Sequence, residues 1–449
     1  METNAAFQWK CQPQAEFLIE NFLNEACRQN RFVDTLSQDL KKHTSTRLFD
    51  WLDHIVLGYT PSLEKNLVDS GFVSDMTTST YRVFHHPGAQ LPRIVVLDKS
   101  LPLVGIAVSV DSIADFLMVR GIAGVIEGSS LSAYRRCCVS SENEISLWVV
   151  ERRGALTMEP ISNNDGYLAK YFKAKEKWQT RPRDFIDEEE GMNQTLKLAE
   201  EIVLLFGKDF AASLILQCER EYWQARNMAG QMQKCRQDRL GMGWANHDHH
   251  TFRSSRINFA KLVRLFETLG FHCRERFYAG EEAGWGAQVM ENPKSRLVLF
   301  LDVDLAPGEL EIDFAHHGLP EITKLGTIGL WCKLHGDSML KSGMHHLEAQ
   351  FMFEDLAKDL QSVGIGMMEP FSSFPYLKQA FTKGEMWPVD SIRVQDLLID
   401  GKITKAQADK ILMQGALGSH LENLQRREGY KGFNQKNVSI IIKKTDPLA

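Results

Sequence analysis

The sequence lacks several features that mark specialised classes of protein. Its eight cysteines are scattered along 449 residues without a CxxC pair, so neither a zinc ribbon nor a disulfide-stapled scaffold is expected. It has no apolar run of about 18 residues, which a membrane-spanning helix needs. It also has no basic excess, since the formal net charge is -6. Nucleic acid and membrane are therefore not expected as partners.

The start of the chain points the same way. METNAAFQWKCQPQ lacks the basic and then apolar layout of a secretory signal peptide. We expect a cytoplasmic protein with reduced thiols. At this length two or three structural units are expected. Because the cysteines form no ligand cluster, a metal ion would be held by histidine nitrogens and carboxylate oxygens.

What the sequence does contain is a pattern of strands and amphipathic helices that occurs twice. In the first half, residues 14–45 are typical of one or two helices, RLFDWLDHIVLGY of a strand and PSLEKNLVDSGF of a helix, and more strands follow as far as EISLWVVERRG. In the second half, HDHHTFRSS indicates a strand, INFAKLVRLFETLGF a helix, and three strand-like segments follow. Asp53-His54 opens one copy and Asp248-His249 opens the other.

This repeat predicts an α+β fold of duplicated βαβββ modules with added helices. A further unit begins at SGMHHLEAQF and closes at LGSHLENLQRREGYKGF. We expect N-terminal helices and a first domain over 1–160, a helical linker over 161–243, and a second domain over 244–449. A helical pair at 389–415 interrupts the second domain as an insert.

Three strands of the second half each offer one inward-facing metal ligand. Side chains alternate across a strand, so His249, Thr251 and Arg253 share one face. His346 takes the corresponding place in GMHHLEAQF, and Glu422 takes it in GSHLENLQR. Two imidazoles and one carboxylate form the facial triad that suits ferrous iron, because positions stay open for substrate and dioxygen. We therefore predict His249, His346 and Glu422 as ligands of Fe(II).

Doubled histidines leave the register of two ligands open. His250 and His345 stay alternatives to their neighbours, although a core or hydrogen-bonded role is more common for such a histidine. His247 would either support a ligand from behind or lie exposed. Glu348 shares the face of His346, and we expect it to orient that ring or to form a surface salt bridge.

At these residues the sequence resembles known families. DHHTFR resembles the strand opening of the vicinal oxygen chelate superfamily, and within it the 2-oxoadipate dioxygenase/decarboxylase (hydroxyglutarate synthase) family. In that family an arginine four residues after the first iron-binding histidine holds the substrate carboxylate, and Arg253 occupies this place. The alternative for Arg253 is an ion pair with a structural carboxylate. The resemblance implies that the modules curve into half-open β-barrels.

The C-terminal segment resembles a second family. LENLQRREGYKGFNQKNV is similar to the end of 4-hydroxyphenylpyruvate dioxygenase, in which a Glu-x-x-Gln-Arg strand carries the iron-binding glutamate. Glu422, Gln425 and Arg426 take those three places. Residues 432–434 match the Gly-Phe-rich turn that leads to a final lid helix, which would close over the site.

The resemblance covers about 244–445 and, more faintly, 14–155. In the first half only His54 matches the ligand pattern. VGIAVSVDSI has glycine and isoleucine where the second histidine would fall, and in EISLWVVERRG the glutamate place lies nearer Trp148 than Glu151. We expect that this copy binds no metal and supports the second half.

The resemblance implies a non-haem, Fe(II)-dependent dioxygenase that decarboxylates a 2-oxo acid, with that acid and dioxygen as its small-molecule partners. A 4-hydroxyphenylpyruvate dioxygenase-like or extradiol-type reaction is one alternative. A non-catalytic small-molecule binding protein of the same fold is another, and a zinc- or nickel-dependent isomerase or lyase, which would consume no dioxygen, is a third. The sequence leaves open whether the chain forms a homo-oligomer.

Overall fold

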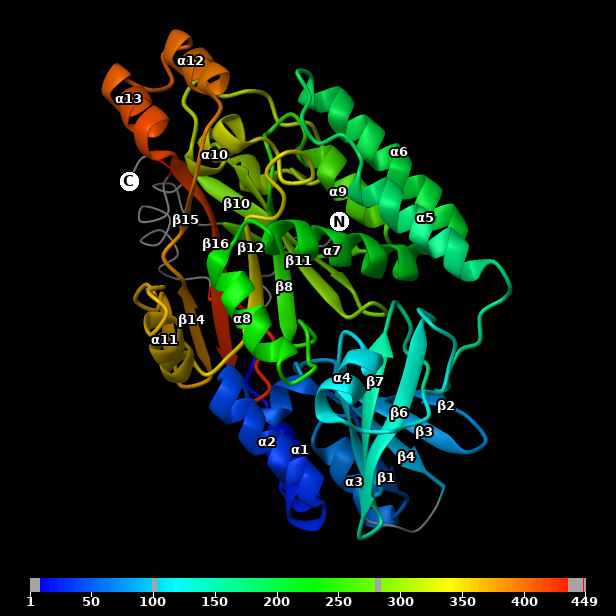
Figure 1. Ribbon diagram of the computed structural model, residues 1–449. Helices are drawn as coiled ribbons and strands as arrows, with labels where there is room; N and C mark the ends of the chain where they lie inside the picture. Colours follow the sequence, from blue (N-terminus) through cyan, green and yellow to red (C-terminus); the bar gives the residue numbers. More distant parts are fainter. Residues whose placement is uncertain (1–8, 99–102, 279–283, 435–446, 448–449) are drawn as a thin grey trace.

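The computed structural model describes residues 9–98, 103–278, 284–434 and 447, and Figure 1 shows two β-sheets joined by a group of helices. Among the described helices, none has both the length and the apolar character needed to cross a bilayer. The first half comprises α1 (Pro13–Gln29), α2 (Arg31–Thr44), the 3-10 helix η1 (Leu48–Trp51), β1 (Leu52–Gly58), α3 (Pro61–Asp69), β2 (Val73–Thr77), β3 (Tyr81–His85), β4 (Arg93–Leu97), β5 (Gly105–Ser109), α4 (Ile113–Arg120), β6 (Tyr134–Glu142) and β7 (Ile145–Arg152).

Four helices connect the halves: α5 (Tyr167–Gln179), α6 (Glu188–Phe206), α7 (Lys208–Gln224) and α8 (Met228–Asp238). The second half comprises β8 (His247–Arg253), α9 (Phe259–Thr268), β9 (His272–Tyr278), β10 (Trp285–Asn292), β11 (Leu297–Asp304), the 3-10 helix η2 (Glu309–Glu311), α10 (Thr327–His335), β12 (His346–Gln350), α11 (Phe353–Gln361), β13 (Ser372–Phe374), β14 (Leu377–Phe381), β15 (Glu385–Trp387), α12 (Ser391–Ile399), α13 (Lys405–Gln414) and β16 (Ala416–Arg426).

Both sheets follow one plan. The first has the strand order β2-β3-β4-β1-β5-β7-β6, and the second has the order β13-β14-β16-β12-β8-β11-β10-β9, with β15 added beside β16. In each sheet two modules meet at antiparallel first strands, β1 with β5 and β8 with β12. Each first strand also runs parallel to the last strand of its own module. The predicted α+β class with repeated modules is confirmed, and the second module of the first sheet has one strand fewer.

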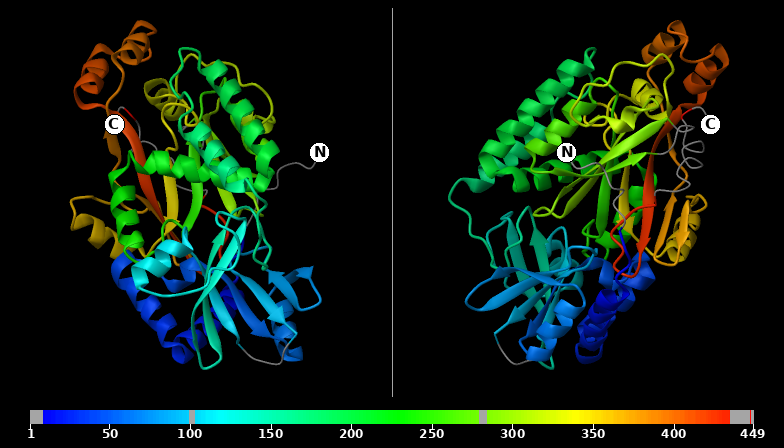
Figure 2. Two further views of the ribbon diagram at one scale, coloured as in Figure 1. Left: turned by 45° about the vertical axis from the view of Figure 1, so that its right-hand side comes forward. Right: turned by 180° about the vertical axis from the view of Figure 1, so that it is seen from behind.

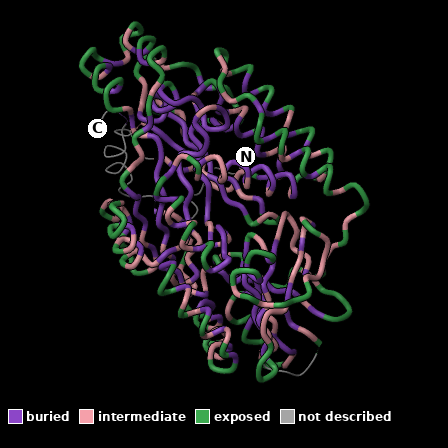
Figure 3. Tube along the Cα trace, viewed as in Figure 1, coloured by how far each residue is buried: buried purple, intermediate pink, exposed green. Residues whose placement is uncertain are grey.

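The largest core lies on one face of the second sheet. Helices α5, α6, α7 and α9 cover this face (Figures 1 and 2), and buried side chains such as Phe252 of β8 and Phe266 of α9 pack between the layers. The apolar residues of α9 recur at helical spacing, so the helix buries one face and exposes the other. Figure 3 shows that the second sheet and α7 are largely buried, whereas the outer sides of α5 and α6 are exposed.

The opposite face of the second sheet is concave and carries α10. A separate apolar cluster joins this helix, through Trp331, to Phe277, Trp285 and Trp387. The insert helices α12 and α13 pack on the far side of α10, where Leu334 and Leu397 belong to one cluster. The concave face is therefore enclosed by aromatic residues, while its centre is polar.

Several elements were not predicted. β6, α10 and the short strands β13 to β15 are absent from the expected pattern, because β6 contains mostly polar or half-buried residues and α10 is buried at every residue except Lys333. A helix that is buried all round has no period to detect. The expected lid helix falls at 435–446, outside the described residues.

Candidate metal centre

The structure brings three predicted ligands together on the concave face of the second sheet. His249 lies on β8, His346 on β12 and Glu422 on β16, and these strands are neighbours in the sheet. One ligand atom from each residue lies within 4.8 Å of the others. The Nε2 atom of His346 is 2.9 Å from Oε2 of Glu422. All three residues are buried, so the group forms an internal site.

His249 is held from behind by a carboxylate. Its Nδ1 atom lies 3.3 Å from Oδ1 of Asp248, and Arg426 donates from Nε and Nη2 to that carboxylate at 3.2 Å each. Although burial opposes it, Arg426 lowers the pKa of Asp248, so the carboxylate is ionised. A proton on Nδ1 would leave the Nε2 lone pair of His249 directed at the site, as metal-binding histidines require.

A β-bulge explains how two adjacent residues reach the same place. Leu347 pairs with His250 and Ala349 pairs with His247, so Asp248 and His249 together oppose a single residue of β12. Such a bulge re-aims side chains that simple alternation would put on opposite faces. Asp53 is the extra residue at the corresponding place of β1.

His346 and Glu422 are also oriented by neighbours. Nδ1 of His346 is 2.8 Å from Nδ1 of His345, so one of the two nitrogens donates and the other accepts. Burial, together with the charge of Arg253, holds the pKa of His346 well below its usual value, which keeps the ring neutral. Gln379 donates to Oε1 of Glu422 at 3.1 Å, and this leaves Oε2 to face the site.

Glu348 lies in the site itself, a position that we did not predict. We expected it to orient His346 or to lie on the surface, but it is completely buried and its Oε2 contacts Nε2 of His249. His345 takes the orienting role instead. Because Glu348 follows His346 by two residues on the same strand face, its alternation with His346 was a usable signal for a fourth donor.

The donor set fits a divalent cation. Burial raises the pKa of Glu422 to about 7 and raises that of Glu348 well above its usual value. Repulsion by nearby acids adds to both shifts. Two acids and two neutral imidazoles around one point lack a positive charge that a metal ion would supply, and nitrogen with carboxylate oxygen suits iron, zinc or manganese.

Arg253 reaches the same interior from the far end of β8. Its side chain is buried, its Nε is 4.0 Å from Oδ2 of Asp302, and its guanidinium lies 5.4 Å from the centre of the Trp331 ring. Burial raises the pKa of Asp302 to about 7 even though Arg253 opposes the shift. Below that pH the Asp302 carboxyl is mostly neutral, so it does not cancel the charge of Arg253.

Two aromatic rings shield the site from solvent. The ring centre of Phe300 on β11 lies 4.7 Å from that of His249, and the ring centre of Phe433 in the C-terminal turn lies 4.9 Å from it. The two phenylalanine rings are themselves 4.6 Å apart in an edge-to-face arrangement. The turn at 432–434 therefore covers the metal site, and the sequence pattern had placed it near the site without showing which residue makes the contact.

The alternative histidines lie outside the ligand group. His250 is buried on the opposite face of β8, where its Nε2 accepts from Nη1 of Arg220 at 3.1 Å. His345 contacts His346 from behind. His247 lies at the start of β8 beside a polar cleft between the two halves.

The first sheet has the acidic residue that orients the first histidine but lacks the other two candidate ligands. Oδ1 of Asp53 lies 2.6 Å from Nδ1 of His54, and Asp53 forms an ion pair with Arg152. Asp248 makes the same two contacts in the second sheet, with His249 and Arg426. In the ladder, His54 lies opposite Ala107, and Ala107 pairs with Trp148. Within the described residues of this half, no other histidine or carboxylate joins His54 in a ligand group.

A glycine marks the second missing ligand. Gly105 lies at the place on β5 that His346 occupies on β12, because Gly105 pairs with Ser146 as His346 pairs with His420. A Cβ atom on Gly105 would lie 2.4 Å from the Ser146 carbonyl oxygen. The backbone therefore leaves no space for a histidine there.

Comparisons with known proteins give likenesses of shape only. No protein-family model matches the chain, and no curated protein matches it significantly. Among solved structures, a triple mutant of 4-hydroxymandelate synthase from Streptomyces coelicolor shares 11% identity over 88% of this chain and 98% of its own, with a TM-score of 0.29. A Mn(II)-bound glyoxalase from Novosphingobium aromaticivorans shares 9% over 85% and 83%, with a TM-score of 0.20.

A catechol 2,3-dioxygenase shares 9% identity over 86% of this chain and 92% of its own, with a TM-score of 0.20. At such low identities and scores these likenesses do not assign an activity to this chain. Its chemistry has to be inferred from the residues of the site.

Proposed function

We propose that the protein is a non-haem Fe(II)-dependent dioxygenase that acts on a 2-oxo acid with oxidative decarboxylation, similar to 2-oxoadipate dioxygenase/decarboxylase. The observation that carries the proposal is the buried group of His249, His346 and Glu422, whose ligand atoms lie within 4.8 Å of one another. Two nitrogens and one carboxylate oxygen leave positions open for a chelating substrate and for dioxygen.

When bound, ferrous iron would supply the electrons that activate dioxygen. The chain supplies orientation and shielding. Asp248 and His345 fix the two imidazole rings, and the rings of Phe300 and Phe433 exclude water from one side of His249. Arg253 is suited to hold a second carboxylate at the far end of the substrate, because a guanidinium fork matches a planar carboxylate.

Iron content and oxygen uptake test this proposal. The full-length protein would be reconstituted with Fe(II) without air and then mixed with oxygenated 2-oxoadipate, 2-oxoglutarate, pyruvate or 4-hydroxyphenylpyruvate. We expect one iron per chain and equal amounts of oxygen consumed and carbon dioxide released with a dicarboxylic 2-oxo acid. A protein that binds no metal, yet still binds these acids, would contradict the proposal and favour a non-catalytic binding protein.

One observation favours a second candidate, a metal-dependent isomerase or lyase. If Glu348 also binds the metal, four protein donors leave two of six positions, enough for a bidentate substrate but not for dioxygen as well. The short approach of Glu348 to His249 places it within reach. Metal binding without oxygen uptake, together with a loss of metal affinity in Glu348→Gln similar to that in Glu422→Gln, would support this candidate over the dioxygenase.

A further inference from the structure

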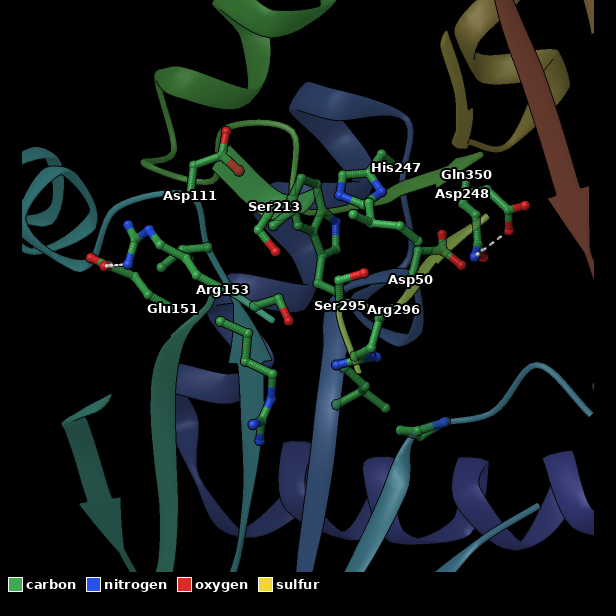
Figure 4. Close-up of a pocket in the computed structure, with 18 of the residues that line it drawn as sticks. Asp50, Asp111, Glu151, Arg153, Ser213, His247, Asp248, Ser295, Arg296 and Gln350 are labelled. Carbon is green, nitrogen blue, oxygen red and sulfur yellow. Dashed lines mark hydrogen bonds and ion pairs between the residues drawn. The ribbon is translucent and has the colours of Figure 1, made fainter. Parts of the chain in front are cut away.

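A polar cleft lies between the two halves, apart from the concave face that holds the metal centre. Its volume is about 190 Å³. The cleft therefore has space for several waters or one small molecule. Figure 4 shows Asp111, Glu151 and Arg153 from the first half on one side of the cleft, and His247 and Arg296 from the second half on the other. Helix α7 forms its third wall.

Two pairs of arginines at this cleft each share one carboxylate. Arg152 and Arg296 share the single carboxylate of Asp53. Arg135 and Arg153 likewise share that of Glu151.

Two of the other acidic residues of the wall are paired with arginines. Asp50 pairs with Arg47 at 2.8 Å, although Arg47 also lies 3.5 Å from Glu16, and Asp248 pairs with Arg426 at 3.2 Å. Asp111 accepts the Trp244 backbone N–H at 2.7 Å and forms no ion pair with the described residues. The excess of arginine at this cleft therefore comes from the shared carboxylates of Asp53 and Glu151.

Arg220 is the arginine of the cleft without a direct ion pair. Its Nη1 donates to Nε2 of His250 at 3.1 Å, which fixes the side chain. Within the described residues no carboxylate oxygen lies within 4.0 Å of its guanidinium, and Asp111 is the acid whose charge acts on it most strongly. A half-buried cation with only such an indirect counter-charge costs free energy that a bound anion would offset.

Helix α7 presents Arg220 as part of a polar stripe. Ser213, Gln217 and Arg220 line the cleft at spacings of four and three residues, so they share one helix face. On the opposite wall, Arg296 adopts the left-handed backbone conformation with φ +57°. This strained turn directs its side chain to Asp53 of the first half, where Nη1 lies 2.6 Å from Oδ2.

We propose that this cleft is a binding site for a small oxyanion, a molecule with a carboxylate or phosphoryl group, with Arg220 as its main charge partner. Guanidinium groups suit both kinds of oxyanion through paired hydrogen bonds. Serine and glutamine side chains around the cleft offer neutral donors for the remaining oxygens. A bound anion would bridge α7 and the end of β7, and would lie next to Asp248, which orients His249.

Calorimetric titration of the metal-free full-length protein tests this site without depending on the function proposed above. The protein would be treated with chelator and titrated at low ionic strength with inorganic phosphate and, separately, with malonate. We expect saturable binding of one anion per chain, and the tighter of the two probes shows whether a phosphoryl or a carboxylate ligand is preferred. Failure of both probes to bind would overturn the proposal.

Two cleft variants with opposite chemistry locate the site. Arg220→Gln removes the cation and Ser213→Asp adds a carboxylate, so each should weaken binding by about tenfold or more. Arg264→Gln removes an exposed arginine on α9 and should leave binding unchanged. Circular dichroism checks that each variant is folded. If Arg220→Gln does not fold, the result for Ser213→Asp tests the proposal. Binding that survives both cleft changes but is lost in Arg253→Gln would put the anion on the concave face and refute the proposal.

Discussion

At the scale of single residues, the metal centre depends on side chains that orient other side chains. Asp248 and His345 each contact the Nδ1 atom of a candidate ligand, so both Nε2 atoms are left to face the same point. Metal-binding histidines generally need such partners to fix the ring and its tautomer. The site is thus organised before any metal arrives, and the residues that organise it can be tested separately from the ligands.

The internal duplication offers a matched control for the first prediction. His249→Ala should weaken Fe(II) binding by at least about a hundredfold, since even supporting residues are worth about 10–100-fold. His54→Ala removes the corresponding histidine of the first half, which belongs to no ligand group among the described residues, and should leave iron content unchanged. Competition with a coloured chelator measures both. Equal losses in the two variants would mean that the effect is on folding.

A second prediction concerns Arg253 and the far end of the substrate. Arg253→Lys keeps the charge but removes the planar fork, so the KM of a dicarboxylic 2-oxo acid should rise about tenfold or more. The KM of pyruvate, which has no second carboxylate, should change little and serves as the control substrate. If both KM values rise together, Arg253 supports the structure, as an ion pair with Asp302 would.

Asp302 gives a prediction about pH. Its pKa in the folded protein is raised by burial to about 7, whereas an unfolded aspartate titrates near 3.9. When a carboxyl has a higher pKa in the folded protein than in the unfolded chain, its contribution to stability is fully present below the unfolded-state pKa. That contribution is lost as the pH rises to the folded-state pKa. The wild type should therefore lose stability relative to Asp302→Asn between about pH 4 and pH 7, by on the order of 4 kcal/mol at most.

Urea unfolding of both proteins across this pH range measures the difference. Other acids in the site titrate in both proteins, so only the gap between the two curves reports on Asp302. Parallel curves would show that its carboxyl titrates normally.

At the scale of elements, equivalent pairs of strands differ between the two sheets. The pair β8 and β12 carries candidate metal ligands, whereas β1 and β5 pack closely without a second one. Both β1 and β8 carry a bulge at their Asp-His pair. The difference lies in the partner strands, because β12 and β16 present His346 and Glu422 where β5 and β7 present Gly105 and Trp148.

Gly105 shows that this difference is built into the backbone. Gly105→Ala should lower the free energy of unfolding by about 1–3 kcal/mol or more, because an added Cβ would lie 2.4 Å from the Ser146 carbonyl oxygen and the parallel strands would have to separate. Gly88→Ala in the same half is the control, since its Cβ would meet the His86 ring at an ordinary 3.6 Å. Thermal or urea unfolding measures both. A stable Gly105→Ala variant would show that strand spacing does not prevent a ligand there.

At the scale of the whole molecule, the two halves are joined by contacts far apart in sequence. Arg296 pairs with Asp53 at 2.6 Å, and the Met352 N–H donates to the Ser45 carbonyl oxygen at 2.7 Å. Gln233 of the connecting helix α8 donates to the Thr44 carbonyl at 2.8 Å. We expect the halves to unfold as one cooperative unit, although the candidate metal centre lies in the second half.

Metal binding tests that cooperation. Fe(II) at about 100 times its Kd should stabilise the whole chain by about 2.7 kcal/mol and shift a single unfolding transition upward. Differential scanning calorimetry without air, with and without iron, measures the shift. Two transitions, of which only one moves with iron, would show that the halves unfold independently.

The sequence by itself determined which strands carry the candidate ligands. Alternation along β8, β12 and β16, together with the repeated Asp-His pair, was enough to select His249, His346 and Glu422, because side-chain direction in a strand depends on local parity. The repeat also predicted the α+β class.

Only the tertiary structure decided how those residues are supported and enclosed. The contact of Glu348 with His249, the pairing of His345 with His346 and the cover by Phe433 depend on a bulge and on the register between strands that are distant in the chain. The arginine-lined cleft likewise exists only where two sheets and α7 meet. Such features have no local pattern, since they arise when long-range packing sets one segment against another.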